Sequence, residues 1–189
     1  MLTEAERSVI ARLWARKLEQ DSRGLPHAER HRNLEPDSAE VISALASGLG
    51  VRRMLEIGGS SGISTIALAA AARRTKGKVT SLEIEPKRQE EARETIRSLG
   101  LSEYVSFIRD DAAKVMATLG EMEFVLLDCE KEDYIRFFDK LPLSPRAIVV
   151  ADNILSHDMV DYVAHVRNLP GSESITLPVG KGLEVTRLR

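Results

Sequence analysis

The stretch that most constrains the fold is a glycine-rich turn at 58–62, between an apolar run at 54–57 and an apolar segment at 63–72. This order predicts a buried strand, a tight turn and a helix. Glycines let the backbone approach a ligand closely, and the helix N-terminus that follows favours a negatively charged group. We therefore predict a nucleotide-like ligand site at the first strand–helix corner of an open sheet. The alternative is a turn that needs its glycines for tight packing alone.

The spacing of the glycines argues against a dinucleotide ligand. The fingerprint G-x-G-x-x-G requires glycine at its first, third and sixth positions. Here Ile57 takes the first position, and only Gly59 and Gly62 fit. Glu56, near the end of the strand, would repel a pyrophosphate and suits a ligand that carries an amine.

Length and composition limit the classes of function. The 189 residues fit a single domain, 1–189, in which 1–34 form an N-terminal helical extension. The formal net charge of −2 gives no electrostatic support for binding nucleic acid or an anionic membrane, and no apolar run is long enough to span a membrane. Cys129 is the only cysteine, which excludes an internal disulfide and predicts a reducing, cytoplasmic setting.

Strand-like and helix-like segments alternate along the chain. An amphipathic helix at 3–20, with a capping box from Thr3 and Glu6, can pack on the sheet, cover the site or pair with a second subunit as a homodimer. Later strands are expected at 53–57, 79–84, 104–108, 124–128, 147–151, 174–177 and 183–188, and later helices at 37–49, 63–73, 87–99, 112–119, 132–140 and 158–167. This pattern predicts an α/β fold: a mostly parallel sheet with helices on both faces, closed by a C-terminal hairpin that adds one antiparallel edge strand.

Acidic residues close each of the first five expected strands. The carboxyl ends of parallel strands meet at one edge of a sheet, where such folds bind ligands. These residues are Glu56, Glu83, Asp110 with Asp111, Asp128, and Asp152 with Asn153. Glu83 lies twenty-one positions past Gly62, where a carboxylate can bind both hydroxyls of a ribose; an exposed strand-end acid is the alternative. Asp110 or Asp111 can lie near an adenine amine, cap the next helix, or do both.

Two neighbouring strand ends carry the more specific chemistry. Asp128, Asp152 and Asn153 offer two carboxylates and an amide oxygen, a set that suits Mg²⁺, with Ca²⁺ or Mn²⁺ as alternatives. Lys131 follows three residues after Asp128 and can act as a general base beside a dication. The alternative is helix capping by Asp152 and Asn153 with a solvated Lys131.

Four longer runs resemble those of one enzyme family. They are VTSLEIEP (79–86), DCEKEDY (128–134), VVADNIL (149–155) and LPVGKGLEV (177–185). With Glu-x-Gly-x-x-x-Gly at the first turn, they are similar to the metal-dependent O-methyltransferases of the catechol and caffeoyl-coenzyme A type and their bacterial relatives, over roughly 33–189. The resemblance implies a Rossmann-like class I fold with seven strands and the cofactor S-adenosylmethionine (SAM). It also implies a divalent metal and methyl transfer to a hydroxyl of a small catechol- or vicinal-diol-like acceptor.

The same resemblance implies a role for each residue of its motifs. It assigns SAM binding to Glu56, Gly58, Gly62, Ser64, Glu83, Ile84, Asp111, Ala112 and Asp128. It assigns the metal to Asp128, Asp152 and Asn153, and the general base to Lys131. Because the sulfonium of SAM supplies the electrophile, Cys129 is expected to be a buried structural thiol and not a nucleophile.

Some features depart from the family or leave alternatives open. Only about thirty residues precede the resemblance, and Ser156-His157-Asp158 stands where the family usually has an aromatic residue, so a ring clamp for a catechol is poorly supplied. A SAM-binding protein without methyl transfer therefore stays open, as does, with less support, a nicotinamide-dependent oxidoreductase. His27 and His31 have a spacing that can suit a metal, but Pro26 and the surrounding charges favour two solvated histidines.

Overall fold

The computed structural model describes residues 2–26 and 29–188. The strands are β1 (Arg53–Ile57), β2 (Lys78–Leu82), β3 (Val105–Ile108), β4 (Met122–Leu127), β5 (Leu143–Ala151), β6 (Ser172–Leu177) and β7 (Leu183–Leu188). The α-helices are α1 (Glu4–Ser22), α2 (Pro36–Gly48), α3 (Ile63–Thr75), α4 (Pro86–Ser98), α5 (Ala112–Met116), α6 (Tyr134–Phe138) and α7 (Val160–Asn168). Short 3₁₀ turns η2 (Ser102–Tyr104) and η3 (Lys131–Asp133) precede β3 and α6.

All seven strands form one sheet in the order β3-β2-β1-β4-β5-β7-β6. The first five pair in parallel, and β7 pairs antiparallel with both β5 and β6. The predicted α/β class and mostly parallel sheet are confirmed. The prediction of an antiparallel edge strand is wrong in one respect, because β7 lies inside the sheet and β6 forms the edge.

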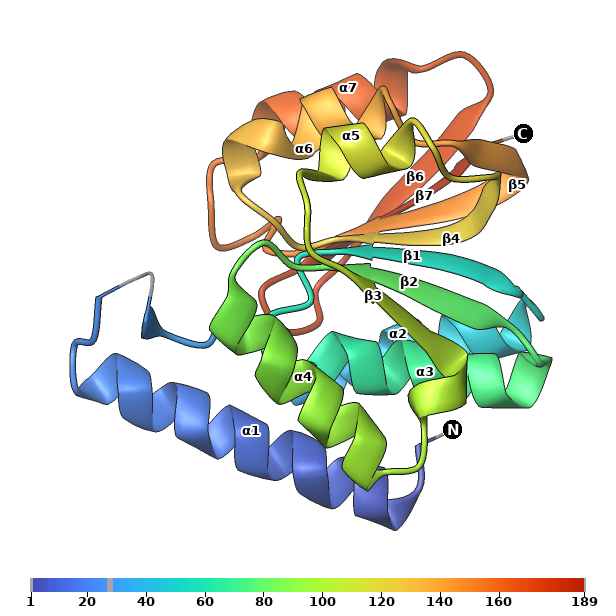
Figure 1. The fold of residues 1–189 in the computed structure, drawn as a ribbon. Coiled ribbons are helices and arrows are strands. Elements are labelled where there is room, and N and C mark those ends of the chain that lie inside the picture. The colour runs from blue at the N-terminus through green and yellow to red at the C-terminus, as the bar shows by residue number, and fades with distance from the viewer. Residues whose placement is uncertain (1, 27–28, 189) are drawn as a thin grey trace.

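Helices cover both faces of the sheet, as Figure 1 shows, with α1 to α4 on one side and α5 to α7 on the other. Side chains of β4 explain the two layers: Phe124 and Leu126 pack into one apolar cluster, and Val125 and Leu127 pack into the other. All four are 0% exposed. A strand buried on both faces reads as an unbroken apolar run, which is why this segment was predictable as a central parallel strand.

The helix that follows the glycine turn is buried along most of its length. Residues 63–72 of α3 are all buried, and four consecutive alanines let α2 and α1 approach it closely. On the outer side, the predicted capping box of Thr3 and Glu6 at the start of α1 is confirmed. Glu6 also forms an ion pair with Arg73 of α3 at 2.5 Å, which joins α1 to the central helix.

Several predicted boundaries differ from the structure. The helix expected at 112–119 ends at Met116, and the one expected at 132–140 is divided into η3 and α6. The strand expected at 147–151 begins earlier, at Leu143. Element ends are set by tertiary contacts and capping, which periodicity alone does not reveal. Among the helices in the described part of the chain, none combines the length and apolar character needed to cross a bilayer.

Candidate functional site

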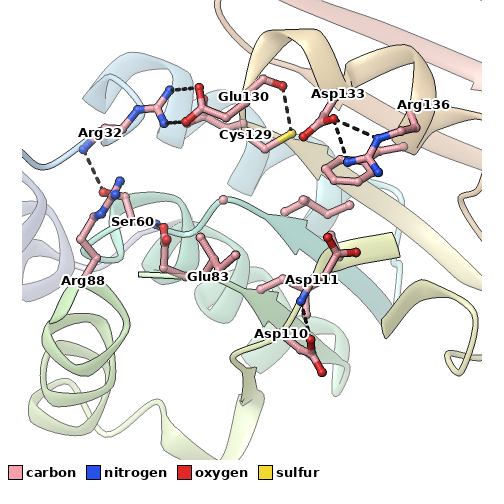
Figure 2. A pocket seen from close by; sticks show the side chains of 17 residues that line it. Arg32, Ser60, Glu83, Arg88, Asp110, Asp111, Cys129, Glu130, Asp133 and Arg136 are labelled. Carbon is pink, nitrogen blue, oxygen red and sulfur yellow. Dashed lines mark hydrogen bonds and ion pairs between the residues drawn. The ribbon is translucent and has the colours of Figure 1, made fainter. Parts of the chain in front are cut away.

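The first cavity opens at the carboxyl ends of β1, β2, β3 and β4. It has a volume of about 200 Å³, and residues at or just after all four strand ends line it: Ile57, Leu82, Asp110, Asp111 and Asp128. Figure 2 shows acidic and basic side chains facing this cavity from several elements. Since β1 has β2 on one side and β4 on the other, the cavity lies where the strand order reverses, the usual ligand position in such folds.

Glu83 presents a fixed carboxylate to this cavity. Its Oε2 accepts the backbone N–H of Ser60 at 2.9 Å, and its Oε1 accepts the backbone N–H of Glu85 at 2.8 Å. The residue is only 8% exposed, so it is not the solvated strand-end acid considered above. Each oxygen keeps a further lone pair, so the carboxylate can accept two hydroxyl hydrogen bonds from a diol.

Gly58 lines the cavity, and its lack of a side chain is required there. Its φ is +97°, and a Cβ at this position would lie 2.1 Å from the backbone oxygen of Asp128. The end of β4 therefore passes directly against the turn. This close approach brings Asp128 to the same cavity as Gly58.

Glu56, Gly62 and Ser64 do not line the first cavity, so the direct contact with SAM expected for them stays a prediction. Glu56 is fully buried beneath the turn, where its Oε2 accepts hydrogen bonds from Thr65 Oγ1 at 2.7 Å and Ser81 Oγ at 2.5 Å. Burial raises the pKa of this carboxyl. A Cβ at Gly62 would meet Ala92 of α4 at 3.2 Å, so this glycine serves helix packing.

Ile84, Asp111 and Ala112 line the cavity, which is compatible with the SAM contact predicted for them. Ile84 is 70% exposed, an unusual setting for a large apolar residue, and it offers a surface for a flat ring. Asp111 Oδ1 accepts the backbone N–H groups of Ala113 and Lys114, so it caps α5. Of the two interpretations of Asp111, capping is confirmed, and its place at the cavity is compatible with the other.

Lys131 is held at the end of β4 by three hydrogen bonds. Its Nζ donates to Tyr134 Oη at 2.9 Å, to the backbone oxygen of Cys129 at 3.1 Å and to Asp128 Oδ1 at 3.4 Å. Tyr134 is 0% exposed, and its hydroxyl also lies 3.0 Å from the backbone oxygen of Leu127. Lys131 is therefore an anchored side chain and not the solvated lysine of the alternative interpretation.

Asp128, Asp152 and Asn153 converge as the sequence predicts. Asn153 Nδ2 donates to Asp128 Oδ1 at 2.9 Å and to Asp152 Oδ2 at 2.8 Å. Asn153 has φ +65°, a left-handed conformation that asparagine tolerates. Burial raises the pKa of both aspartates, and the charge of Asp128 raises that of Asp152 further.

This group fits a hard cation by its chemistry. Asp152 Oδ1 is buried without a hydrogen-bond partner, so a buried carboxylate oxygen is left for a ligand. The amide of Asn153 presents its nitrogen to the carboxylates, and rotation of the amide would present its oxygen as a third ligand. In the described part of the chain, no group of three or more His, Cys, Asp or Glu residues could hold a metal, so the amide is needed to complete this set.

A second cavity, of about 220 Å³, lies on the other side of Asp128. Lys131, Asn153 and Lys181 line it, together with residues of α1 and of the loop after it. Asp128 and Arg32 line both cavities. Two ligands bound in the two cavities would therefore meet at Asp128.

Three residues at this site were not predicted from the sequence: Arg32, Glu35 and Glu130. The Arg32 backbone N–H donates to Ser60 Oγ at 2.9 Å, and its guanidinium pairs with Glu130, which also lines the first cavity (Figure 2). Glu35, at the start of α2, pairs with Lys181 at 3.0 Å, and its charge contributes to the raised pKa of Asp128 and Asp152. No local motif marks Arg32 and Glu35, because they reach the site from the segment before β1, whereas Glu130 lies in the run that follows β4.

Cys129 and His31 lie in environments other than those expected. Burial raises the pKa of the Cys129 thiol to about 12, which opposes a nucleophilic role. The residue is only half-buried and lines the first cavity, so the burial expected for it is incomplete. The prediction that His31 is solvated is wrong: it is 4% exposed, and its Nε2 lies 2.6 Å from Glu91 Oε2. His27 lies outside the described residues.

The sheet and the joined cavities define an α/β protein with a nucleotide-type ligand site at the topological switch point. The sequence model of the O-methyltransferase family matches residues 12–169, and the chain belongs to this family. Residues of the chain are 35% identical, over 141 positions, to a catechol O-methyltransferase of Mycobacterium tuberculosis, covering 69% of this chain and 64% of that protein. A catechol O-methyltransferase of Niastella koreensis is 28% identical over 130 positions, covering 65% of this chain and 58% of its own.

Solved structures share the fold. An SAH-bound methyltransferase from Podospora anserina matches with a TM-score of 0.83 at 21% identity, covering 100% of this chain and 89% of its own. The O-methyltransferase from Bacillus cereus in complex with SAH matches with a TM-score of 0.78 at 19% identity, covering 100% and 93%. These matches confirm the Rossmann-like methyltransferase fold. The chain spans 64% and 58% of the two catechol O-methyltransferases named above.

Proposed function

We propose that this protein transfers a methyl group from SAM to a hydroxyl of a small vicinal-diol or catechol-like acceptor, with the help of a divalent cation. The observation that carries the proposal is that two cavities meet at Asp128. One cavity offers the carboxylate of Glu83, and the other is lined by Lys131 and Asn153. Transfer between two bound molecules requires such adjacency, because catalysis of this kind depends on holding the reactants together.

The first cavity supports SAM as the donor. A fixed carboxylate at Glu83 suits the two hydroxyls of a ribose, and Ile84 with Ala112 offers an apolar surface for a purine. Cofactor-bound and SAH-bound structures occur among the solved relatives of this fold. When bound, SAM supplies an electrophilic methyl group, so no covalent intermediate on the protein is required.

The two buried aspartates, Asp128 and Asp152 (the acidic pair), support the proposal of a metal. Asp128, Asp152 and the rotated amide of Asn153 would hold a dication such as Mg²⁺, with Mn²⁺ or Ca²⁺ as alternatives. When bound, the ion supplies a Lewis acid that lowers the pKa of a hydroxyl of the acceptor. It would also neutralise two buried carboxylates whose repulsion is otherwise opposed chiefly by Lys131.

Lys131 is the residue that we assign as general base. Its side chain is only 14% exposed, and the residue lines the second cavity. To take a proton from the acceptor, Lys131 has first to release one of its own protons to solvent and then to exchange its contact with Asp128 for one with the hydroxyl. Tyr134 and the backbone oxygen of Cys129 would keep the nitrogen at the cavity during this exchange.

The test is transfer of a labelled methyl group from SAM to a panel of vicinal diols, with Mg²⁺ and with EDTA. We expect product with Mg²⁺ and little with EDTA. Binding of SAH without transfer to any diol would favour the alternative of a SAM-binding protein. Tight binding of NAD with no binding of SAM would favour an oxidoreductase.

We further propose a cytoplasmic location, supported by the presence of a single cysteine in the sequence. As its binding partner we propose the small-molecule acceptor. We propose no role for nucleic acid or membrane, in keeping with the net charge of −2. A homodimer is compatible with the exposed outer surface of α1 and is tested by light scattering.

A further inference from the structure

The second cavity has a lining that differs from that expected for an aromatic acceptor. All eleven described residues that line it are polar or charged: five are lysine or arginine, and two are aspartate. No phenylalanine, tyrosine or tryptophan of the described residues is among them. Binding sites for small organic ligands are mostly apolar with few polar groups, so this composition indicates a hydrophilic, charged ligand.

The charges of this lining do not cancel evenly. Three of the five cations each lie beside a different carboxylate: Arg32 beside Glu130, Lys131 beside Asp128, and Lys181 beside Glu35. Among the described residues, the other two cations, Lys17 and Arg30, share one carboxylate. Asp21 Oδ2 lies 2.6 Å from Lys17 Nζ, and Asp21 Oδ1 lies 3.2 Å from Arg30 Nη1. Because Lys17 and Arg30 share Asp21, this side of the second cavity carries one positive charge in excess.

The side chains on this side of the cavity are also held in place, and their charges are partly removed from water. The Lys17 side chain is 12% exposed, and its Nζ lies 4.9 Å from the centre of the Trp14 ring. Lys17 and Asp21 are one turn apart on α1, and the loop that carries Arg30 is tied to this helix by the backbone N–H of His31, which donates to Gln20 Oε1 at 2.8 Å. Charges that are partly removed from water act more strongly on a ligand than solvated ones.

We propose that the acceptor carries a carboxylate, which binds Lys17 and Arg30 while its hydroxyls face Asp128 and Asn153. This inference rests on the proposed function, since it names the class of acceptor for the same site. A single excess charge matches a monoanion, and a guanidinium can hold both oxygens of a carboxylate. The two cations line the same cavity of about 220 Å³ as Asp128 and Asn153. A small hydroxy acid can therefore reach from one group to the other.

The test compares two ligands that differ only in this charge. Protein saturated with SAH and Mg²⁺ is titrated by calorimetry with 3,4-dihydroxybenzoate and with its neutral isostere 3,4-dihydroxybenzamide. We expect the acid to bind about ten- to a hundredfold more tightly, the ratio that a charge-assisted hydrogen bond supplies. A small aliphatic pair, glycerate and glycerol, tests whether the preference needs an aromatic ring.

Variants then locate the preference. Lys17→Gln and Arg30→Gln should each lower the acid-to-amide ratio about fivefold or more, while affinity for SAH stays unchanged because neither residue lines the first cavity. Arg12→Gln is the matched control, since Arg12 is an exposed cation of the same helix that lines neither cavity. It should leave the ratio unchanged.

In the binding assays, three outcomes would overturn the inference: equal binding of acid and amide, a preference that neither variant reduces, or no binding of either ligand to the SAH-loaded protein. Methylation of the amide as efficiently as the acid would also overturn the inference, because the acceptor would then need no carboxylate. The proposed function would still hold. Failure to bind SAH at all would instead remove the proposed function.

Discussion

Lys131 Nζ lies 3.4 Å from Asp128 Oδ1, so the assigned base and a carboxylate shared by both cavities form one ion pair. Lys131→Arg keeps the positive charge but cannot take a proton, because a guanidinium is not deprotonated in proteins. We expect kcat to fall about 10²- to 10⁴-fold. Affinity for SAH should be nearly unchanged, since Lys131 does not line the first cavity.

The measurement is steady-state kinetics with Mg²⁺, together with calorimetry of SAH. Lys131→Ala should show the same loss, partly recovered at higher pH where hydroxide replaces the base. Lys140→Ala, an exposed lysine after α6, is the control. A normal kcat in Lys131→Arg would leave the metal as the sole activator of the hydroxyl.

Glu83→Gln should weaken SAH binding. The substitution keeps the shape of the side chain but replaces the carboxylate, whose two oxygens would accept hydrogen bonds from the two hydroxyls. Loss of this charged acceptor should cost about 1.5–3 kcal/mol of binding free energy. Calorimetry should therefore show a Kd raised about ten- to a hundredfold. Glu90→Gln, an exposed acid of α4, serves as the control and should bind normally. An unchanged Kd in Glu83→Gln would mean that Glu83 only positions Ser60 and Glu85.

Mg²⁺ should stabilise the protein through the acidic pair. A ligand at one hundred times its Kd adds about 2.7 kcal/mol to the free energy of unfolding. Thermal unfolding should therefore give a higher Tm with Mg²⁺ than with EDTA. Asp152→Asn removes one of two repelling buried carboxylates, so it should keep its stability in EDTA and lose the response to Mg²⁺. A response that survives in Asp152→Asn would place the ion elsewhere.

The Glu6–Arg73 ion pair should make stability depend on acidic pH. Burial by itself raises the pKa of Glu6, but hydrogen bonds from Arg73 and from the backbone N–H of Thr3 outweigh it, so the pKa lies below its ordinary value of 4.5. A lowered pKa stabilises the folded state above pH 4.5, and this contribution is lost as the pH falls through the folded-state value.

Glu6→Gln should therefore unfold more easily than the wild type at pH 7, by about 1–2 kcal/mol, and the difference should shrink at acidic pH. Urea unfolding at several pH values measures this. Glu4→Gln, an exposed residue in the same first turn, should differ from the wild type by less than about 0.5 kcal/mol. A gap of the same size at pH 3 and pH 7 would contradict the assignment.

Gly58→Ala should destabilise the fold because of a clash and not only because of its backbone conformation. Its Cβ would lie 2.1 Å from the Asp128 backbone oxygen, whereas a Cβ at Gly100, with φ +68°, meets nothing within 4 Å. We expect Gly100→Ala to cost about 1 kcal/mol and Gly58→Ala at least about 1 kcal/mol more. Equal costs in urea unfolding would show that β4 moves aside.

The sequence by itself determined the layers, the strand ends and the acidic cluster. Glu83, Asp128, Asp152 and Asn153 were predictable because each follows a strongly apolar strand, and parallel strands bring their carboxyl ends to one edge. Such placement depends only on local periodicity and on the direction of the strands. The glycine turn was predictable for the same reason, since a short strand and an apolar helix flank it.

Only the tertiary structure decided how deep each side chain lies and which distant segments complete the site. Glu56 belongs to the same strand as Ile57, yet it is sealed beneath the turn while Ile57 lines the cavity, because successive side chains of a strand point to opposite faces. Lys17, Arg30 and Glu35 reach the site through the packing of α1 and α2 against α3. Their roles depend on contacts between residues far apart in the chain, which no local pattern encodes.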